Sequence, residues 1–182
     1  GAIVIAYQRA SGLGIRQAKV LLASIPMTAV ANIDSLTTFN SSYDEIEIYG
    51  NGLMPSATDT LAFRFAIGGV VDTASNYYEN LINSNSATST TSMRLGSGAT
   101  VLNPGRGVSF HITLLNINGS ATMKVADYSV TYQSAATPTF TNATFASTYV
   151  ATGAISGIRF FWTGASNFVA SGQILIYGIK NS

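Results

Sequence analysis

The amino-acid sequence predicts an all-β protein, an antiparallel β-sandwich of the jelly-roll-like kind with an extended N-terminal arm. Two observations lead to this fold class. The helix formers Glu, Lys and Gln are scarce, while Thr, Val, Ile, Phe and Tyr, which suit a pleated and half-buried surface, are abundant. Period-2 runs of apolar residues also recur at short intervals with turn residues between them. A chain of 182 residues can bury a sizeable core as one domain.

The first 26 residues are expected to form a separate arm, with the sandwich domain over residues 27–182. The arm holds three basic and no acidic residues, whereas the remainder holds six basic and eight acidic residues. Gly12 and Gly14 are expected to act as a hinge. The apolar residues of the arm need a partner surface, either a neighbouring subunit or the chain's own body. The expected assembly contacts are Ile3, Ile5, Tyr7, Arg9, Arg16 and Lys19.

Alternation predicts which strand faces lie in the core. In residues 43–49, Ile46 and Ile48 alternate with Glu45 and Glu47, which indicates one apolar and one polar face. Two further runs, 60–67 and 108–117, show the same period. Their expected core residues are Leu61, Phe63, Phe65, Ile67, Val108, Phe110, Ile112 and Leu114.

Turn residues suggest how some strands pair. Asn118 and Gly119 predict a hairpin that joins 108–117 to 123–132. Residues 155–162 and 173–179 are expected to form a last pair. Residues 83–91 are almost entirely polar and are expected to form an exposed loop or a polar edge strand.

One charge is expected to lie on an apolar strand face. Asp127 shares its face with Met123 and Val125, where an unpaired carboxylate would be costly. A structural salt bridge to Arg64, Arg94 or Arg159 is therefore expected.

Catalytic, metal and cofactor sites are not expected. The chain has one histidine and no cysteine, and His111 falls in mid-strand, where a half-buried structural role is favoured. Glu45 and Glu47 cluster without a matched acid on a second strand, which favours a solvated face over glycoside hydrolysis. No zinc, calcium or phosphate-binding motif is present.

The sequence also argues against two classes of partner. A net charge of +1, with an acidic balance outside the arm, argues against nucleic acid. No apolar run approaches the roughly 20 residues of a membrane span, so membrane insertion is not expected.

Glycan recognition remains as an alternative. Exposed aromatic rings beside amides and hydroxyls can bind sugars, because the ring covers the C–H face while polar groups bond the sugar hydroxyls. The candidate contacts are Tyr77, Tyr78, Trp162 and Phe168. Packing in the core is the competing interpretation for these rings.

Two parts of the chain resemble a β-sandwich domain of tailed-bacteriophage virion proteins. Asn32-Ile33-Asp34-Ser35-Leu36 followed by Tyr43-Asp44-Glu45-Ile46-Glu47-Ile48 is similar to its opening. The close is similar over Ile155 to Phe161 and Ala170 to Lys180, where Gly157-Ile158-Arg159-Phe160 and Leu175-Ile176-Tyr177-Gly178 match its pattern. Trp162 and Phe168 depart from that pattern, in which a small polar residue is usual at the position of Trp162.

The resemblance implies a structural protein of the virion surface and carries over no catalytic residues. We therefore expect a non-enzymatic virion protein that docks through its arm and displays its sandwich, as a capsid decoration or as a tail or tail-fibre knob. Its expected partners are other virion proteins and copies of itself, with a trimer suggested by family analogy only. A receptor-binding module for host surface polysaccharide is the alternative, and a capsule depolymerase is the less favoured third class.

Overall fold

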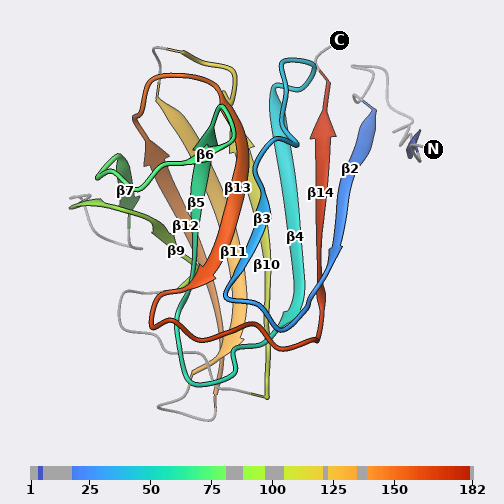
Figure 1. Ribbon diagram of the computed structural model, residues 1–182, viewed down its shortest axis with the longest axis vertical. Helices are drawn as coiled ribbons and strands as arrows, with labels where there is room; N and C mark the ends of the chain where they lie inside the picture. Colours follow the sequence, from blue (N-terminus) through green and yellow to red (C-terminus); the bar gives the residue numbers. More distant parts are fainter. Residues whose placement is uncertain are drawn as a thin grey trace.

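The protein folds as two packed antiparallel β-sheets, which confirms the predicted β-sandwich (Figure 1). The computed structural model describes residues 4–5, 18–80, 88–96, 105–120, 123–134 and 139–180. No helix occurs among these residues, so none there could cross a membrane.

The larger sheet has nine strands in the order β1-β2-β14-β4-β10-β11-β12-β7-β8. Neighbouring strands in it run antiparallel throughout. In chain order these strands are β1 (Val4–Ile5), β2 (Lys19–Pro26), β4 (Glu45–Leu53), β7 (Tyr77–Asn80), β8 (Thr88–Thr90), β10 (Val108–Leu115), β11 (Lys124–Gln133), β12 (Phe140–Tyr149) and β14 (Gln173–Ile179).

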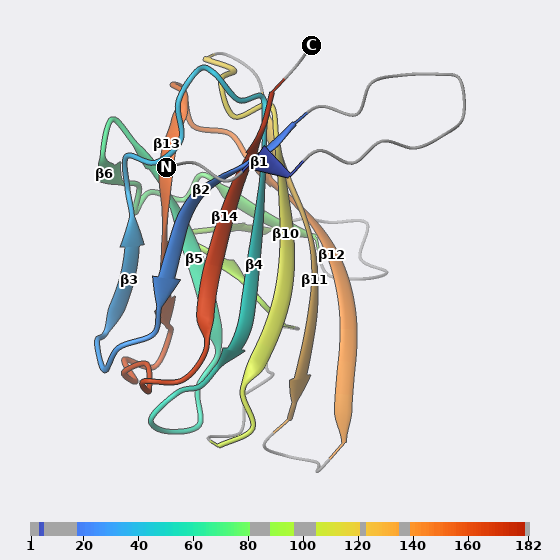
Figure 2. The same ribbon diagram turned by 90° about the vertical axis from the view of Figure 1, so that its right-hand side faces the viewer.

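The smaller sheet has five strands and covers one face of the larger one. Its order is β3-β13-β5-β6, and β9 also pairs with β5. The strands are β3 (Asn32–Ser35), β5 (Leu61–Ile67), β6 (Val70–Val71), β9 (Met93–Arg94) and β13 (Ile155–Trp162). The chain passes repeatedly from one sheet to the other, and Figure 2 shows β2, β14, β4, β10, β11 and β12 side by side in the larger sheet.

The core lies between the two sheets and is rich in aromatic rings. The predicted inward residues Ile46, Ile48 and Phe63 are all fully buried. Rings from opposite sheets meet there: Phe110 of β10 stacks on Phe160 of β13 with centroids 5.3 Å apart. Burial of an aromatic pair of this kind supplies both transfer free energy and a preferred ring geometry.

A buried tyrosine ties the two sheets together by hydrogen bonds. Tyr77 of β7 is fully buried, and its hydroxyl accepts a bond from the backbone N–H of Phe65 in β5 at 3.0 Å. The same hydroxyl donates to the backbone oxygen of Asp72 at 2.9 Å. Tyr149 of β12 donates to the Asp72 carboxylate at 2.6 Å. These bonds fix the connection between β6 and β7 against both sheets.

The expected domain boundary at residue 26 is wrong as a structural division. Residues 19–26 form β2, which pairs along its length with β14 of the sandwich. Val20, Leu22 and Ile25 pack against the core, which explains why an apolar segment follows the basic positions. β2 therefore belongs to the domain, and the backbone of Val4–Ile5 pairs in turn with Lys19 and Val20.

The two expected strand pairings have different outcomes. The hairpin at residues 118–119 is confirmed, because β10 and β11 pair in register from Val108↔Tyr132 to Leu115↔Val125. The expected pair of 155–162 with 173–179 is wrong: β13 pairs with β3 and β5 in the smaller sheet, whereas β14 pairs with β2 and β4 in the larger one. The second half of the polar segment does form an edge strand, β8, while residues 81–87 lie outside the described residues.

The expected buried position of Asp127 is also wrong. Asp127 is exposed, and the opposite face of β11 points inward. Lys124 occupies that inward face at the strand end and is 1% exposed. Its ammonium donates to the backbone oxygen of Ala151 at 2.6 Å, which supplies a partner for the buried charge.

Replacing Tyr77 by Phe tests the link between the sheets. The variant Tyr77→Phe leaves the Phe65 N–H and the Asp72 carbonyl without their partner, so we expect a loss of about 1 to 3 kcal/mol in the free energy of unfolding. Tyr78→Phe is the matched control and should change stability by less than about 0.5 kcal/mol. Equal denaturant midpoints for the two variants would contradict the assigned role of Tyr77.

Candidate functional site

The aromatic residues expected to contact glycan are mostly core residues. Tyr77, Trp162 and Phe168 are 0%, 2% and 1% exposed, respectively, so their assignment as surface contacts is corrected. Tyr78 alone points to the opposite side of its strand, where it is half-buried. Trp162 and Phe168 pack on each other with ring centroids 5.3 Å apart.

Asp59 holds the loop that leads to Phe168. Its carboxylate is buried and accepts backbone N–H bonds from Thr60 at 2.7 Å, Gly164 at 2.7 Å and Ser166 at 3.1 Å. These bonds hold the loop after β13 against the loop before β5, and Phe168 forms a bridge there with Pro55. Trp162 and Phe168 are therefore core residues and do not form an exposed patch.

Of the expected assembly contacts, only Lys19 has a described side chain. Ile5 is described through its backbone, which pairs with Lys19. The side chain of Lys19 is engaged within its own domain, as set out below. Ile3, Tyr7, Arg9 and Arg16 lie outside the described residues.

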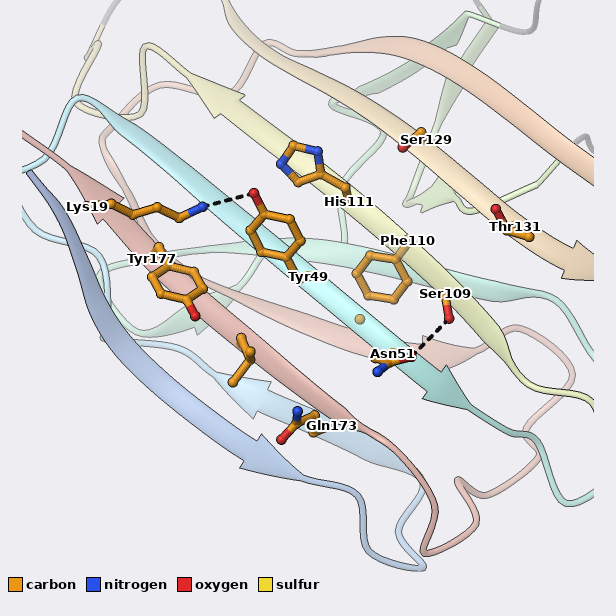
Figure 3. Close-up of a pocket in the computed structure, with 12 residues that line it drawn as sticks. Lys19, Tyr49, Asn51, Ser109, Phe110, His111, Ser129, Thr131, Gln173 and Tyr177 are labelled. Carbon is orange, nitrogen blue, oxygen red and sulfur yellow. Dashed lines mark hydrogen bonds between the residues drawn. The ribbon is translucent and has the colours of Figure 1, made fainter. Parts of the chain in front are cut away.

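A groove of about 580 Å³ lies on the solvent side of the larger sheet, across β2, β14, β4, β10 and β11 (Figure 3). Its volume is within the range typical of small-molecule sites. The pairing of β4 with β10 is irregular between Val108 and Phe110. Gly50 is required at this place, because a Cβ there would lie 2.2 Å from a ring atom of Phe110.

One row of the groove, the aromatic row, carries the rings of Tyr49 and His111. Leu175, Tyr49, His111 and Ser129 lie directly opposite one another on four adjacent strands. The rings of Tyr49 and His111 stack with centroids 4.4 Å apart and planes 8° apart. Tyr177 stands edge-on to Tyr49, with centroids 5.9 Å apart. Among the described residues, no ring stacks face to face on Tyr177 or on the second side of His111.

A charged cluster closes the β2 end of this row. Lys19 forms an ion pair with Glu47 and donates a hydrogen bond to the Tyr49 hydroxyl at 2.9 Å. The Tyr49 hydroxyl in turn donates to Glu47 at 2.8 Å. The Lys19 ammonium also lies 4.4 and 4.5 Å from the ring centres of Tyr49 and Tyr177, as in a cation–π contact. The sequence predicted a solvated strand face for Glu47, but its carboxylate is instead engaged by Lys19 and Tyr49.

The cluster keeps both of its charges at neutral pH. Burial alone would raise the pKa of the Glu47 carboxyl, but hydrogen bonds from Lys19 and Tyr49 lower it below its ordinary value. Burial alone would lower the pKa of the Lys19 ammonium, whereas its bonds to Glu47 and Tyr49 raise it above its ordinary value. The ion pair is consequently stable over the whole physiological pH range.

His111 is half-buried, as expected from the sequence, and uncharged at neutral pH. Burial lowers its pKa below the ordinary value, and the attraction of Glu47 does not offset this effect. Its Nε2 atom has no hydrogen-bond partner in the described part of the chain. The neutral ring can therefore serve as an apolar surface with polar edges.

A second row of the groove carries amides and hydroxyls. Gln173 lies opposite Asn51, and Ser109 lies opposite Thr131. The hydroxyl of Ser109 donates to the Asn51 side chain at 3.4 Å and accepts from the N–H of Gly52 at 3.2 Å. The Thr131 hydroxyl donates to Asn142 of β12 at 2.6 Å, which continues the polar row beyond the groove. Side-chain groups of this kind are both donors and acceptors.

This arrangement is suited to binding. The described residues contain no group of three or more metal-ligating side chains. The positions opposite Glu45 are Ile179 and Leu115, and those opposite Glu47 are Tyr177 and Thr113. Hydrolysis of a glycosidic bond by paired carboxylates requires an acid on each side of a cleft, and the strands beside Glu45 and Glu47 carry none at these positions.

Comparison with known proteins yields no relative for this chain. No family model, no curated protein and no solved structure matches it.

Acid titration tests the role of Asp59 in the loop after β13. Burial alone would raise the pKa of Asp59, but the N–H groups of Gly164, Ser166 and Thr60 lower it below its ordinary value. The stabilisation is thus present above the unfolded-state pKa of about 3.9 and is lost as the pH falls through the lower folded-state value. The difference in unfolding free energy between wild type and Asp59→Asn should shrink from pH 6 to pH 2. A difference that stays constant would contradict this account.

Proposed function

We propose that the protein is a non-enzymatic, receptor-binding protein of a bacteriophage virion surface, and that its groove binds a host surface glycan. The observation that carries the glycan part is the groove itself, in which an aromatic row and an amide and hydroxyl row run side by side on the solvent face of one rigid sheet. The virion part rests on the sequence resemblance.

The chemistry of the two rows matches the two kinds of surface on a sugar. The apolar C–H face of a pyranose packs on aromatic rings, and its hydroxyls exchange hydrogen bonds with amides and hydroxyls. Tyr177 and His111 offer the rings, while Asn51, Gln173 and Thr131 offer the polar groups. Because all of these side chains stand on paired strands, little ordering is needed when a ligand binds.

A binding role is favoured over the depolymerase alternative. Glu47 is committed to Lys19 and Tyr49, and its charge is needed there to balance the ammonium. A catalytic acid must instead give up and take back a proton during the reaction. The depolymerase remains the less favoured class.

Docking on the particle is proposed through the residues that precede β2. Lys19 is occupied within the sandwich, so the proposed docking segment shortens from residues 1–26 to residues 1–18. Its proposed partners are other virion proteins of the capsid or tail, or further copies of this chain. Analogy with the family that the sequence resembles suggests a trimer in the second case. A capsid decoration or tail knob without sugar binding is the second candidate, favoured by the same resemblance.

Substitution of Tyr177 tests glycan binding in the groove. Tyr177→Ala removes the ring that stands edge-on to Tyr49 beside the aromatic row, and loss of one ring contact is worth on the order of 1 kcal/mol, so binding should weaken several-fold. Tyr78→Ala is the matched control, because Tyr78 is also half-buried but lies on β7 outside the groove. Affinities are to be measured on a glycan array and by calorimetry. A several-fold loss in Tyr78→Ala with none in Tyr177→Ala would place recognition elsewhere.

Two truncations test docking separately from folding. A chain that starts at residue 18 retains β2 and should unfold cooperatively like the full chain, yet fail to join virions during assembly. A chain that starts at residue 27 loses β2 and the core contacts of Val20, Leu22 and Ile25, so it should be strongly destabilised. Normal incorporation of the chain that starts at residue 18, measured by mass spectrometry of purified particles, would rule out docking through the preceding residues.

A further inference from the structure

We infer that the groove takes a linear, uncharged oligosaccharide segment of about four units that lies across the strands of the larger sheet. This inference rests on the proposed function and adds the orientation, the length and the charge class of the ligand. It follows from the register of the strands and from the pairing of the charges in the groove.

The orientation follows from the two rows. The aromatic row joins residues that are directly paired on β14, β4, β10 and β11. The polar row starts at Gln173 and Asn51 and continues through Ser109 and Thr131 toward Asn142 of β12. Both rows therefore run perpendicular to the strands, and a ligand that uses both must lie in that direction (Figure 3).

The length follows from the spacing of the strands. Neighbouring strands lie about 4.8 Å apart, so the three steps from β14 to β11 within the groove span about 14 Å, and the fourth step, to Asn142 of β12 beyond the groove, extends the polar row to about 19 Å. One step is close to the length of one hexose unit in an extended chain. Each added sugar unit, up to about four, therefore reaches one further strand, and each of these strands presents a hydroxyl or amide side chain of the polar row.

The charge class follows from the state of Lys19. Among the residues that line the groove, Lys19 is the one with a charged side chain at neutral pH, since His111 is neutral. The Lys19 ammonium is already paired with Glu47 and bonded to Tyr49. A carboxylate or sulfate group on the ligand would lose hydration without gaining an unpaired cation, which is unfavourable. Neutral sugars incur no such cost.

Calorimetric titration with defined oligosaccharides tests the inference. The probes are linear β-1,4-linked glucose, mannose and galactose oligosaccharides of one to six units, together with oligogalacturonates of the same lengths. For at least one neutral series, affinity should rise at least about tenfold between one and about four units and then level off, as each further contact is worth on the order of 1 kcal/mol. Oligogalacturonates should bind more weakly than the neutral series of equal length.

Variants of the polar row test whether this row causes the rise in affinity with oligosaccharide length. Asn51→Ala and Thr131→Ala should reduce the gain between one and four units, whereas Tyr78→Ala should leave it unchanged. Two outcomes would overturn the inference but leave glycan binding in the groove intact. The first is an affinity that does not depend on the length of the oligosaccharide. The second is tighter binding of oligogalacturonates than of neutral oligosaccharides of equal length, provided that Tyr177→Ala abolishes this binding. If no probe binds, or if Tyr177→Ala leaves all binding intact, the proposed function fails together with the inference.

Discussion

The register of four adjacent strands, β14, β4, β10 and β11, determines both faces of the larger sheet. Because side chains alternate along a strand, the pairing that buries Ile46 and Ile48 also turns Glu47 and Tyr49 outward. A slip by one residue would exchange the two sets and place a carboxylate in the core, at a cost of several kcal/mol. Core packing therefore holds Tyr49 against His111 and Asn51 near Ser109 with no help from a ligand. The groove is in this sense a by-product of the same constraint that makes the fold stable.

Besides the strand register, the groove depends on charged side chains that neutralise one another within the protein. Lys19 and Glu47 neutralise each other at one end of the groove, and elsewhere Arg94 pairs with the buried Glu79 and Arg159 with Asp34. About half of the outward positions on β10, β11 and β12 are Ser, Thr or Asn, beside a few exposed apolar residues such as Leu115 and Phe140. This explains the scarcity of lysine: the outer face is hydrated through hydroxyls and amides, which can also exchange water for the hydroxyls of a sugar.

Sequence patterns predicted the strands better than their partners. Alternation identified the inward faces of β4, β5 and β10, and the Asn-Gly turn identified one hairpin, since these signals are local. The pairing of β14 with β2 and β4 joins segments more than a hundred residues apart and leaves no local trace. Trp162 shares the inward face of β13 with Phe160, so alternation along that strand already favoured a core position. The position of Phe168 instead depends on a loop that Asp59 of a distant segment holds in place. The half-buried position of His111 in mid-strand was predicted, but its stacking on Tyr49 requires the pairing of β4 with β10.

The central claim is that the outer face of the larger sheet, and not its β7 and β8 edge, is the recognition surface. The most direct measurement is an NMR titration of the ¹⁵N-labelled protein with a neutral linear tetrasaccharide that binds it. The account predicts shifts of the backbone amides of Asn51, Ser109, Ser129 and Thr131, with the amides of Tyr78 and Ser89 unmoved. Shifts confined to Tyr78, Ser89 and their neighbours would contradict it.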